Sequence, residues 1–138
     1  MQRREFLAAS LCGLTFLAAG CGKGAKSQYG VVKFAGKATF DGQPIPEGFK
    51  IVFTPAEGRQ SAAAVKADGE FYARYTNAED GVQKGSLKVT VGWDEEDKGP
   101  IPAGFEDLVK AYSGDPENYM EISVEKANTS YELNFPKK

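Results

Sequence analysis

The sequence predicts an all-β fold, a seven-stranded antiparallel β-sandwich, for the chain after residue 30. The main observation is a repeated alternation of apolar and polar residues with a period of two, which indicates strands with one buried face. In addition, clusters of Gly, Pro, Asp and Asn separate the alternating segments, as expected for the turns of antiparallel sheets. The alternating segments are residues 33–40, 49–54, 62–67, 71–75, 87–93, 120–125 and 131–135.

The connections between these strands contain residues suited to turns. Residues 41–46 combine an Asp-Gly pair with two prolines, which favour an extended loop and disfavour pairing at a sheet edge. Asp68 and Gly69 tolerate the left-handed backbone of a tight hairpin between the third and fourth strands. Longer polar connections are expected at residues 55–59 and 77–85.

The segment 94–118 interrupts the alternation. Within it, Phe105, Leu108, Val109 and Tyr112 have the spacing of residues on one face of a helix. The sequence therefore predicts a short helix or an irregular insertion here, over one end of the sandwich.

Residues 1–20 have the pattern of an export signal. Positive charge from Arg3 and Arg4 precedes an apolar run, which ends in small residues at Gly20 directly before Cys21. This order resembles the lipobox of bacterial lipoproteins. The resemblance implies cleavage between Gly20 and Cys21 and a lipid (palmitate-type) anchor on Cys21. It also implies a location at the cell membrane or outer membrane, facing the periplasm or the cell exterior.

Alternatives to this interpretation stay open. Residues 3–7 resemble the twin-arginine export motif, although the two arginines also suffice as the positive charge of any signal. The apolar run from residue 6 to 20 is shorter than the roughly 20 residues of a membrane-spanning helix, which disfavours a permanent span. An ordinary secretory signal with an incidental Cys21 is the other alternative. The composition of residues 21–30 predicts a flexible tether, and residues 31–138 are expected to form the folded domain.

Composition excludes several classes of function. The chain has no histidine, and Cys21 is the only cysteine after the signal segment, which excludes Cys/His zinc sites, thiol nucleophiles and Ser-His-Asp triads. After residue 20, 15 of the 17 Lys and Arg and 18 of the 19 Asp and Glu remain, without a basic block, so nucleic acid is not an expected partner. Neither a cofactor nor a metal is expected. Carboxylate-based hydrolysis is the one common catalytic class left.

Three short motifs resemble a known family. Residues 33–53, with Asp-Gly-Gln-Pro-Ile-Pro between two strands, resemble the opening of carboxypeptidase-regulatory-like (transthyretin-like) domains. Residues 67–71 resemble the Asp-Gly hairpin of that family, and residues 85–91 its Gly-x-Leu-x-Val-x-Val strand. The resemblance covers about residues 30–136 and implies a non-catalytic module that supports folding, adhesion or binding. It transfers no functional residue, because enzymes that share the fold depend on histidines.

The sequence offers one candidate contact surface. Tyr72 and Arg74 have the outward parity of the fourth strand, whereas Trp93, at the end of the fifth, shares the parity of the core residues Val89 and Val91. Trp93 is therefore expected mainly in the core, with stacking against a ligand as the alternative.

Two further patterns favour ordinary structural roles. The acidic run Asp94–Asp97 is either a cation-binding loop or a solvated acidic loop, and the absence of a calcium-loop spacing favours the latter. A Lys–Asn isopeptide bond between the first and last strands would need Lys33 or Lys37 with Asn134. The alternation places all three outward, which disfavours the bond.

The sequence thus predicts a lipid-anchored, non-enzymatic envelope module that binds or scaffolds an extracytoplasmic partner, carbohydrate or peptide. The first alternative is a carboxylate-based envelope hydrolase, which needs two acids about 5–10 Å apart in a cleft. The second is an accessory subunit of an envelope protein complex, which predicts an exposed apolar patch on the segment 94–118.

Overall fold

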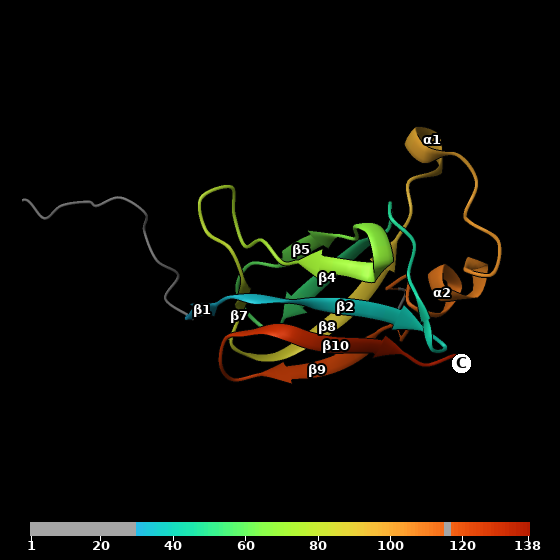
Figure 1. The fold of residues 1–138 in the computed structure, drawn as a ribbon. Helices are drawn as coiled ribbons and strands as arrows, with labels where there is room; N and C mark the ends of the chain where they lie inside the picture. Colours follow the sequence, from blue (N-terminus) through green and yellow to red (C-terminus); the bar gives the residue numbers. More distant parts are fainter. Residues whose placement is uncertain (1–29, 115–116) are drawn as a thin grey trace, which may run out of the picture.

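The protein consists mainly of β-strands, as the alternation predicts (Figure 1). The computed structural model describes residues 30–114 and 117–138, and each of the seven predicted segments contains a strand. Within these ranges, no helix is both long and apolar enough to cross a membrane. The residues predicted to direct export and lipidation lie outside the described residues: Arg3, Arg4, Gly20 and Cys21.

One of the two main sheets consists of β2 (Phe34–Phe40), β3 (Gln43–Pro44), β6 (Glu70–Tyr72) and β10 (Asn128–Phe135). All the other strands of this sheet pair with β2, so β2 is its organising strand. The strands β3 and β6 run antiparallel to β2, whereas β10 runs parallel to it.

The other main sheet is antiparallel and has the order β5 (Ser61–Ala64), β4 (Lys50–Pro55), β8 (Gly85–Gly92) and β9 (Met120–Val124). A separate small pair joins β1 (Val31–Val32) to β7 (Val82–Gln83). The three two-residue strands β1, β3 and β7 are additional to the predicted ones. Segments this short contain no alternation that a sequence pattern can detect.

The connection between β5 and β6 is one of those that join the two sheets. The turn is a short 3₁₀ segment, η1 (Ala67–Gly69), in which Asp68 and Gly69 have φ angles of 61° and 78°. The predicted left-handed turn at Asp68-Gly69 is therefore confirmed. Beyond the turn, Ala62 and Arg74 exchange two backbone hydrogen bonds, so the chain that continues from β6 also pairs with β5.

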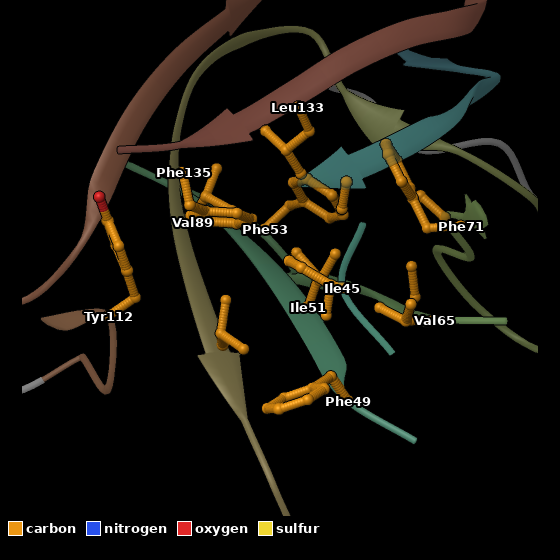
Figure 2. Close-up of a cluster of buried hydrophobic side chains, with 14 of the residues drawn as sticks. Ile45, Phe49, Ile51, Phe53, Val65, Phe71, Val89, Tyr112, Leu133 and Phe135 are labelled. Atoms are coloured by element: carbon orange, nitrogen blue, oxygen red, sulfur yellow. The ribbon is translucent and has the colours of Figure 1, made fainter. Parts of the chain in front are cut away.

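The inward side chains of both sheets form one apolar core (Figure 2). The Phe34 ring lies 5.5 Å from the Phe53 ring, edge-on at 88°, and 5.8 Å from the Phe71 ring. Such aromatic pairs contribute about 0.5–1.5 kcal/mol beyond the burial of their area. Since Phe34 and Phe71 belong to one sheet and Phe53 to the other, these contacts hold the two sheets face to face.

Two short helices, α1 (Glu95–Lys98) and α2 (Glu106–Ala111), form the predicted insertion. They lie at the end of the domain opposite β1 (Figure 1). Leu108 and Tyr112 are buried, and the Tyr112 hydroxyl donates to the carbonyl of Pro136 at 2.6 Å. Burial also raises the pKa of Tyr112 above its ordinary value. The segment around α2 therefore closes one end of the core, as its helical spacing predicts.

The pairing of β2 with β10 corrects the expectation of a fully antiparallel sandwich, because these two strands are parallel. The chain leaves β9 in one sheet and enters β10 in the other, so residues 125–127 cross between sheets and do not form a hairpin. A period of two shows which face of a strand is buried, but it contains no information about the neighbouring strand.

The contact between β2 and β10 leaves no room for a side chain at Gly36, because an added Cβ would overlap the backbone carbonyl of Tyr131. Gly36→Ala is therefore expected to destabilise the domain by about 1–3 kcal/mol. The control is Gly92→Ala in β8, where an added Cβ has no atom within 4 Å. Urea unfolding followed by circular dichroism measures both variants. Equal free energies of unfolding would contradict the close approach of β10 to β2.

Candidate functional site

A groove with a volume of about 1460 Å³ follows β5 on the outer side of its sheet and reaches one end of β4 and of β8, at Lys50 and Gly92. In the ladder Ala64 lies opposite Lys50, and Lys50 lies opposite Gly92, while Ala62 is the next outward position along β5. The Cβ atoms of opposed residues on one face of a sheet lie about 4.5–5.5 Å apart, so the size of neighbouring side chains determines how deep the surface is at that point. Two alanines and a glycine in adjacent positions therefore hollow this face.

Trp93 forms one end wall of the groove, together with Lys98 of α1. The Trp93 ring lies 4.7 Å from the Phe49 ring, and its Nε1 donates to the carbonyl of Gly99 at 2.8 Å. A Cβ added at Gly48 would lie 2.8 Å from the ring, so the indole packs directly against that backbone. Trp93 is partly buried against the core, as its parity predicts, and it also contributes to the groove.

The opposite end wall contains Arg59 and Tyr75, and a buried glutamine holds both. Gln83 is only 3% exposed; its Oε1 accepts from the Arg59 N–H at 2.9 Å and from the Tyr75 hydroxyl at 3.2 Å. Its Nε2 donates to the carbonyl of Glu57 at 2.8 Å. A buried amide with all these partners is expensive to disturb, because a change that leaves its polar atoms buried leaves them without hydrogen bonds. Gln83 therefore fixes the loop that presents Arg59.

Sequence reasoning did not identify Gln83 or Arg59 as residues of a site. Gln83 lies in a two-residue strand, between Gly81 and Gly85, where no periodic pattern separates an inward from an outward position. Its three partners come from two loops that are distant in sequence. A buried polar residue of this kind is recognised only once the surrounding loops are placed.

The groove is basic although the protein as a whole is acidic. It is lined by five of the 17 Lys and Arg residues but by only two of the 19 Asp and Glu residues. Two of the five basic residues have acidic neighbours, since Arg74 lies 3.5 Å from Asp80 and Lys98 lies 3.3 Å from Asp97. The basic lining residues are Lys50, Arg59, Lys66, Arg74 and Lys98, and the acidic ones are Glu47 and Asp94.

Tyr72 and Arg74, the predicted contact residues of the fourth strand, both point outward. They line a smaller hollow of about 370 Å³, and Arg74 lines the main groove as well. Tyr72 is 43% exposed, and its hydroxyl donates to Oδ2 of Asp80 at 3.3 Å. Arg74 lines both hollows, Tyr72 lines the smaller one and Trp93 the main groove, so the three predicted contact residues lie in one continuous region of the surface.

The two carboxylates that line the groove are not a buried pair. Glu47 and Asp94 are both exposed, and the only buried polar side chains in the described ranges are those of Ser61 and Gln83. The carboxylate of Asp94 also accepts the backbone N–H groups of Glu96 and Asp97, at 3.1 and 3.2 Å, as the N-cap of α1. A catalytic acid is usually held protonated by apolar surroundings, which neither carboxylate has.

In residues 94–114 and 117–118, the described part of the insertion, the acidic run is present but no large hydrophobic side chain is exposed. All four residues of Asp94–Asp97 are exposed, and no group of three or more potential metal ligands occurs in residues 30–114 and 117–138. Phe105 and Leu108 are turned into the core. Over the same described ranges, the one exposed large hydrophobic side chain is Tyr72, which lies outside the insertion.

The candidate isopeptide residues are exposed, as their parity predicts. Lys33, Lys37 and Asn134 all lie on the solvent side of β2 and β10 or beside them. In the ladder Asn134 is opposite Thr39, whose hydroxyl donates to the Asn134 side-chain oxygen at 2.5 Å. The dry pocket that such a bond requires is therefore not formed around this asparagine.

Comparison with known proteins adds no assignment: no family model, curated protein or solved structure matches the chain. The resemblance to carboxypeptidase-regulatory-like domains therefore stays a hypothesis based on three motifs. What the site does has to be inferred from its own residues and their geometry.

Gln83→Leu is expected to destabilise the domain by about 1–3 kcal/mol, because the buried amide and its three partners would lose their hydrogen bonds. Amide hydrogen exchange should also increase in residues 57–60, since the Arg59 N–H and the Glu57 carbonyl are no longer held. The control is Gln60→Leu, an exposed position whose side chain has one long hydrogen bond to Thr54. Unchanged exchange in the Gln83 variant would contradict its role in holding the groove wall.

Proposed function

We propose that the protein is a lipid-anchored, non-enzymatic module of the bacterial envelope that binds an extended extracytoplasmic ligand. The groove along β5, at the ends of β4 and β8, is the observation on which this proposal mainly depends. Its volume of about 1460 Å³ exceeds the roughly 300–1,000 Å³ of typical small-molecule pockets, and it is open to solvent along a sheet face. A chain-like carbohydrate or peptide fits such a shape better than a small metabolite.

The anchoring part of the proposal comes from the sequence of residues 1–30. The lipobox-like residues before Cys21 support a lipid anchor there, and the domain begins at β1 a few residues later. A chain of nine residues spans at most roughly 30 Å, so the domain would work close to the membrane surface. The insertion with α1 and α2 lies at the other end from β1 (Figure 1). Lys98 of α1 belongs to the same groove wall as Trp93, so this wall is on the side of the insertion and away from the attachment point.

The non-enzymatic part is supported by the side chains in the groove. Glu47 and Asp94 are exposed, and Asp94 is engaged in capping α1, so neither has the surroundings of a tuned acid or base. Apart from Trp93, the remaining polar lining consists of basic residues, two amides (Gln60 and Asn77) and two hydroxyls (Tyr75 and Thr76), which are suited to holding a ligand by hydrogen bonds and charge.

We also propose that the domain is transthyretin-like. The motifs that suggest this family fall on matching elements: the Pro-rich loop lies between β2 and β4, and Asp68-Gly69 forms the turn before β6. The third motif forms β8 at the centre of the second sheet. The predicted family therefore agrees with the order of these elements.

Lipidation is tested in a bacterial host by membrane fractionation and intact-mass measurement. The wild-type protein should sediment with membranes and have a mass that begins at Cys21 with added acyl chains, whereas Cys21→Ser should carry no lipid. Cys12→Ser, within the signal segment, is the matched control and should behave like the wild type. A wild-type mass without acyl chains would overturn the anchored-module proposal.

Ligand binding is tested by blocking the groove with Ala64→Trp, an exposed position on its floor. The full-length protein in detergent is passed over immobilised charged and neutral polysaccharides and unstructured peptides. The variant should lose about tenfold in affinity for the retained polymer, which is about 1.4 kcal/mol. Ser86→Trp, exposed on β8 outside the groove, should bind like the wild type. Equal binding by both variants would exclude the groove as the site.

A further inference from the structure

We propose that the ligand of the groove is an acidic polysaccharide, a polymer of sugars that carry carboxylates. This inference rests on the proposed binding function and adds the chemical class of the ligand. The observation behind it is that basic side chains and ring-bearing side chains gather at one face of a domain that is otherwise acidic.

The charge distribution favours an anionic ligand. Residues 30–138 contain 13 Lys and Arg and 18 Asp and Glu, and yet the groove takes five of the former and two of the latter. In the described ranges, no ion pair is formed by Lys50, Arg59 or Lys66. Arg59 donates its Nε–H to the Tyr75 carbonyl at 3.1 Å, a neutral partner, so all three residues keep a positive charge that a ligand can meet. A positive groove on a negative molecule concentrates anions locally and orients them on approach.

The length of the groove favours a polymer over a single sugar acid. Its lining extends from Gln60, directly before β5, to Lys66, two residues after it, which corresponds to roughly 20 Å at the rise of a strand. Basic residues occur along this length, with Arg59 at one end and Lys66 at the other. Several carboxylates that repeat along one chain can therefore be bound at once.

The backbone of this face favours a polysaccharide over an acidic peptide. A peptide that adds a strand needs an open sheet edge with free N–H and C=O groups. The outer edge of β5 is closed at Ala62 by two hydrogen bonds with Arg74, and Lys66 N–H is bonded to the Glu70 carbonyl. Recognition therefore depends on side chains: basic groups for carboxylates, and the exposed ring of Tyr72 beside them for the apolar face of a sugar.

The test measures binding of full-length protein in detergent to sodium polygalacturonate, with neutral dextran and poly-L-glutamate as comparison probes. The wild type should bind polygalacturonate best, and binding should weaken between about 20 and about 300 mM salt. The double variant Lys50→Glu/Lys66→Glu should lose about tenfold or more in affinity, at least 1.4 kcal/mol. Lys126→Glu/Lys137→Glu makes the same change of charge at exposed positions outside the groove and should bind like the wild type.

Several results would overturn the inference. Equal binding of dextran would exclude a role for charge, stronger binding of poly-L-glutamate would indicate a peptide ligand, and equal losses in both double variants would indicate unspecific attraction. If Ala64→Trp abolishes the binding observed in any of these cases, the groove is still the binding site and the proposed function stands. If the wild type is folded by circular dichroism but binds neither polysaccharide nor poly-L-glutamate, both the proposed binding function and the inference are wrong.

Discussion

The antiparallel pairing of β4 with β5 is the constraint on which the core and the groove both depend. Ile51 and Phe53 of β4, Ala63 of β5 and Val65 directly after β5 face inward, and the alternate positions face the solvent. A slip of one residue would expose the apolar side chains and bury Lys50, so the hydrophobic pattern specifies the register strongly. The same register places small residues of β5 and β8 beside Lys50, and thereby makes the outer face concave. Stability and shape of the candidate site therefore have one origin.

The walls of the groove depend on tertiary contacts and not on the strands themselves. At one end the indole of Trp93 is held between the Phe49 ring and the carbonyl of Gly99. At the other end the buried amide of Gln83 holds the loop of Arg59. Both anchors connect a surface loop to the core, so the loops are restrained before any ligand arrives. Restraint of this kind lowers the entropy that a ligand would otherwise have to remove on binding.

In the proposed function, the membrane anchor and the insertion lie at opposite ends of the domain. The predicted anchor precedes β1, while the insertion with α1 and α2 closes the opposite end (Figure 1). The groove crosses a face between these ends, so a polymer lying in it would not have to compete with the tether for space. The surplus of acidic groups outside the groove repels anionic polymers from other faces and leaves the basic face as the favoured approach.

The sequence by itself determined the mainly β class, the approximate position of seven strands and the Asp68-Gly69 turn, because each depends on local propensity and periodicity. For the segment around Leu108 it predicted a short helix or an irregular insertion, and the structure has a helix there. Parity alone also placed Tyr72 and Arg74 on an outward face and Trp93 at the core end of its strand. Only the tertiary structure decided that β10 pairs with β2 in parallel, and that Gln83 orders the Arg59 loop. It alone collected basic residues from five separate segments into one groove. These features depend on contacts between segments distant in sequence, and a one-dimensional pattern contains no information about which distant segments become neighbours.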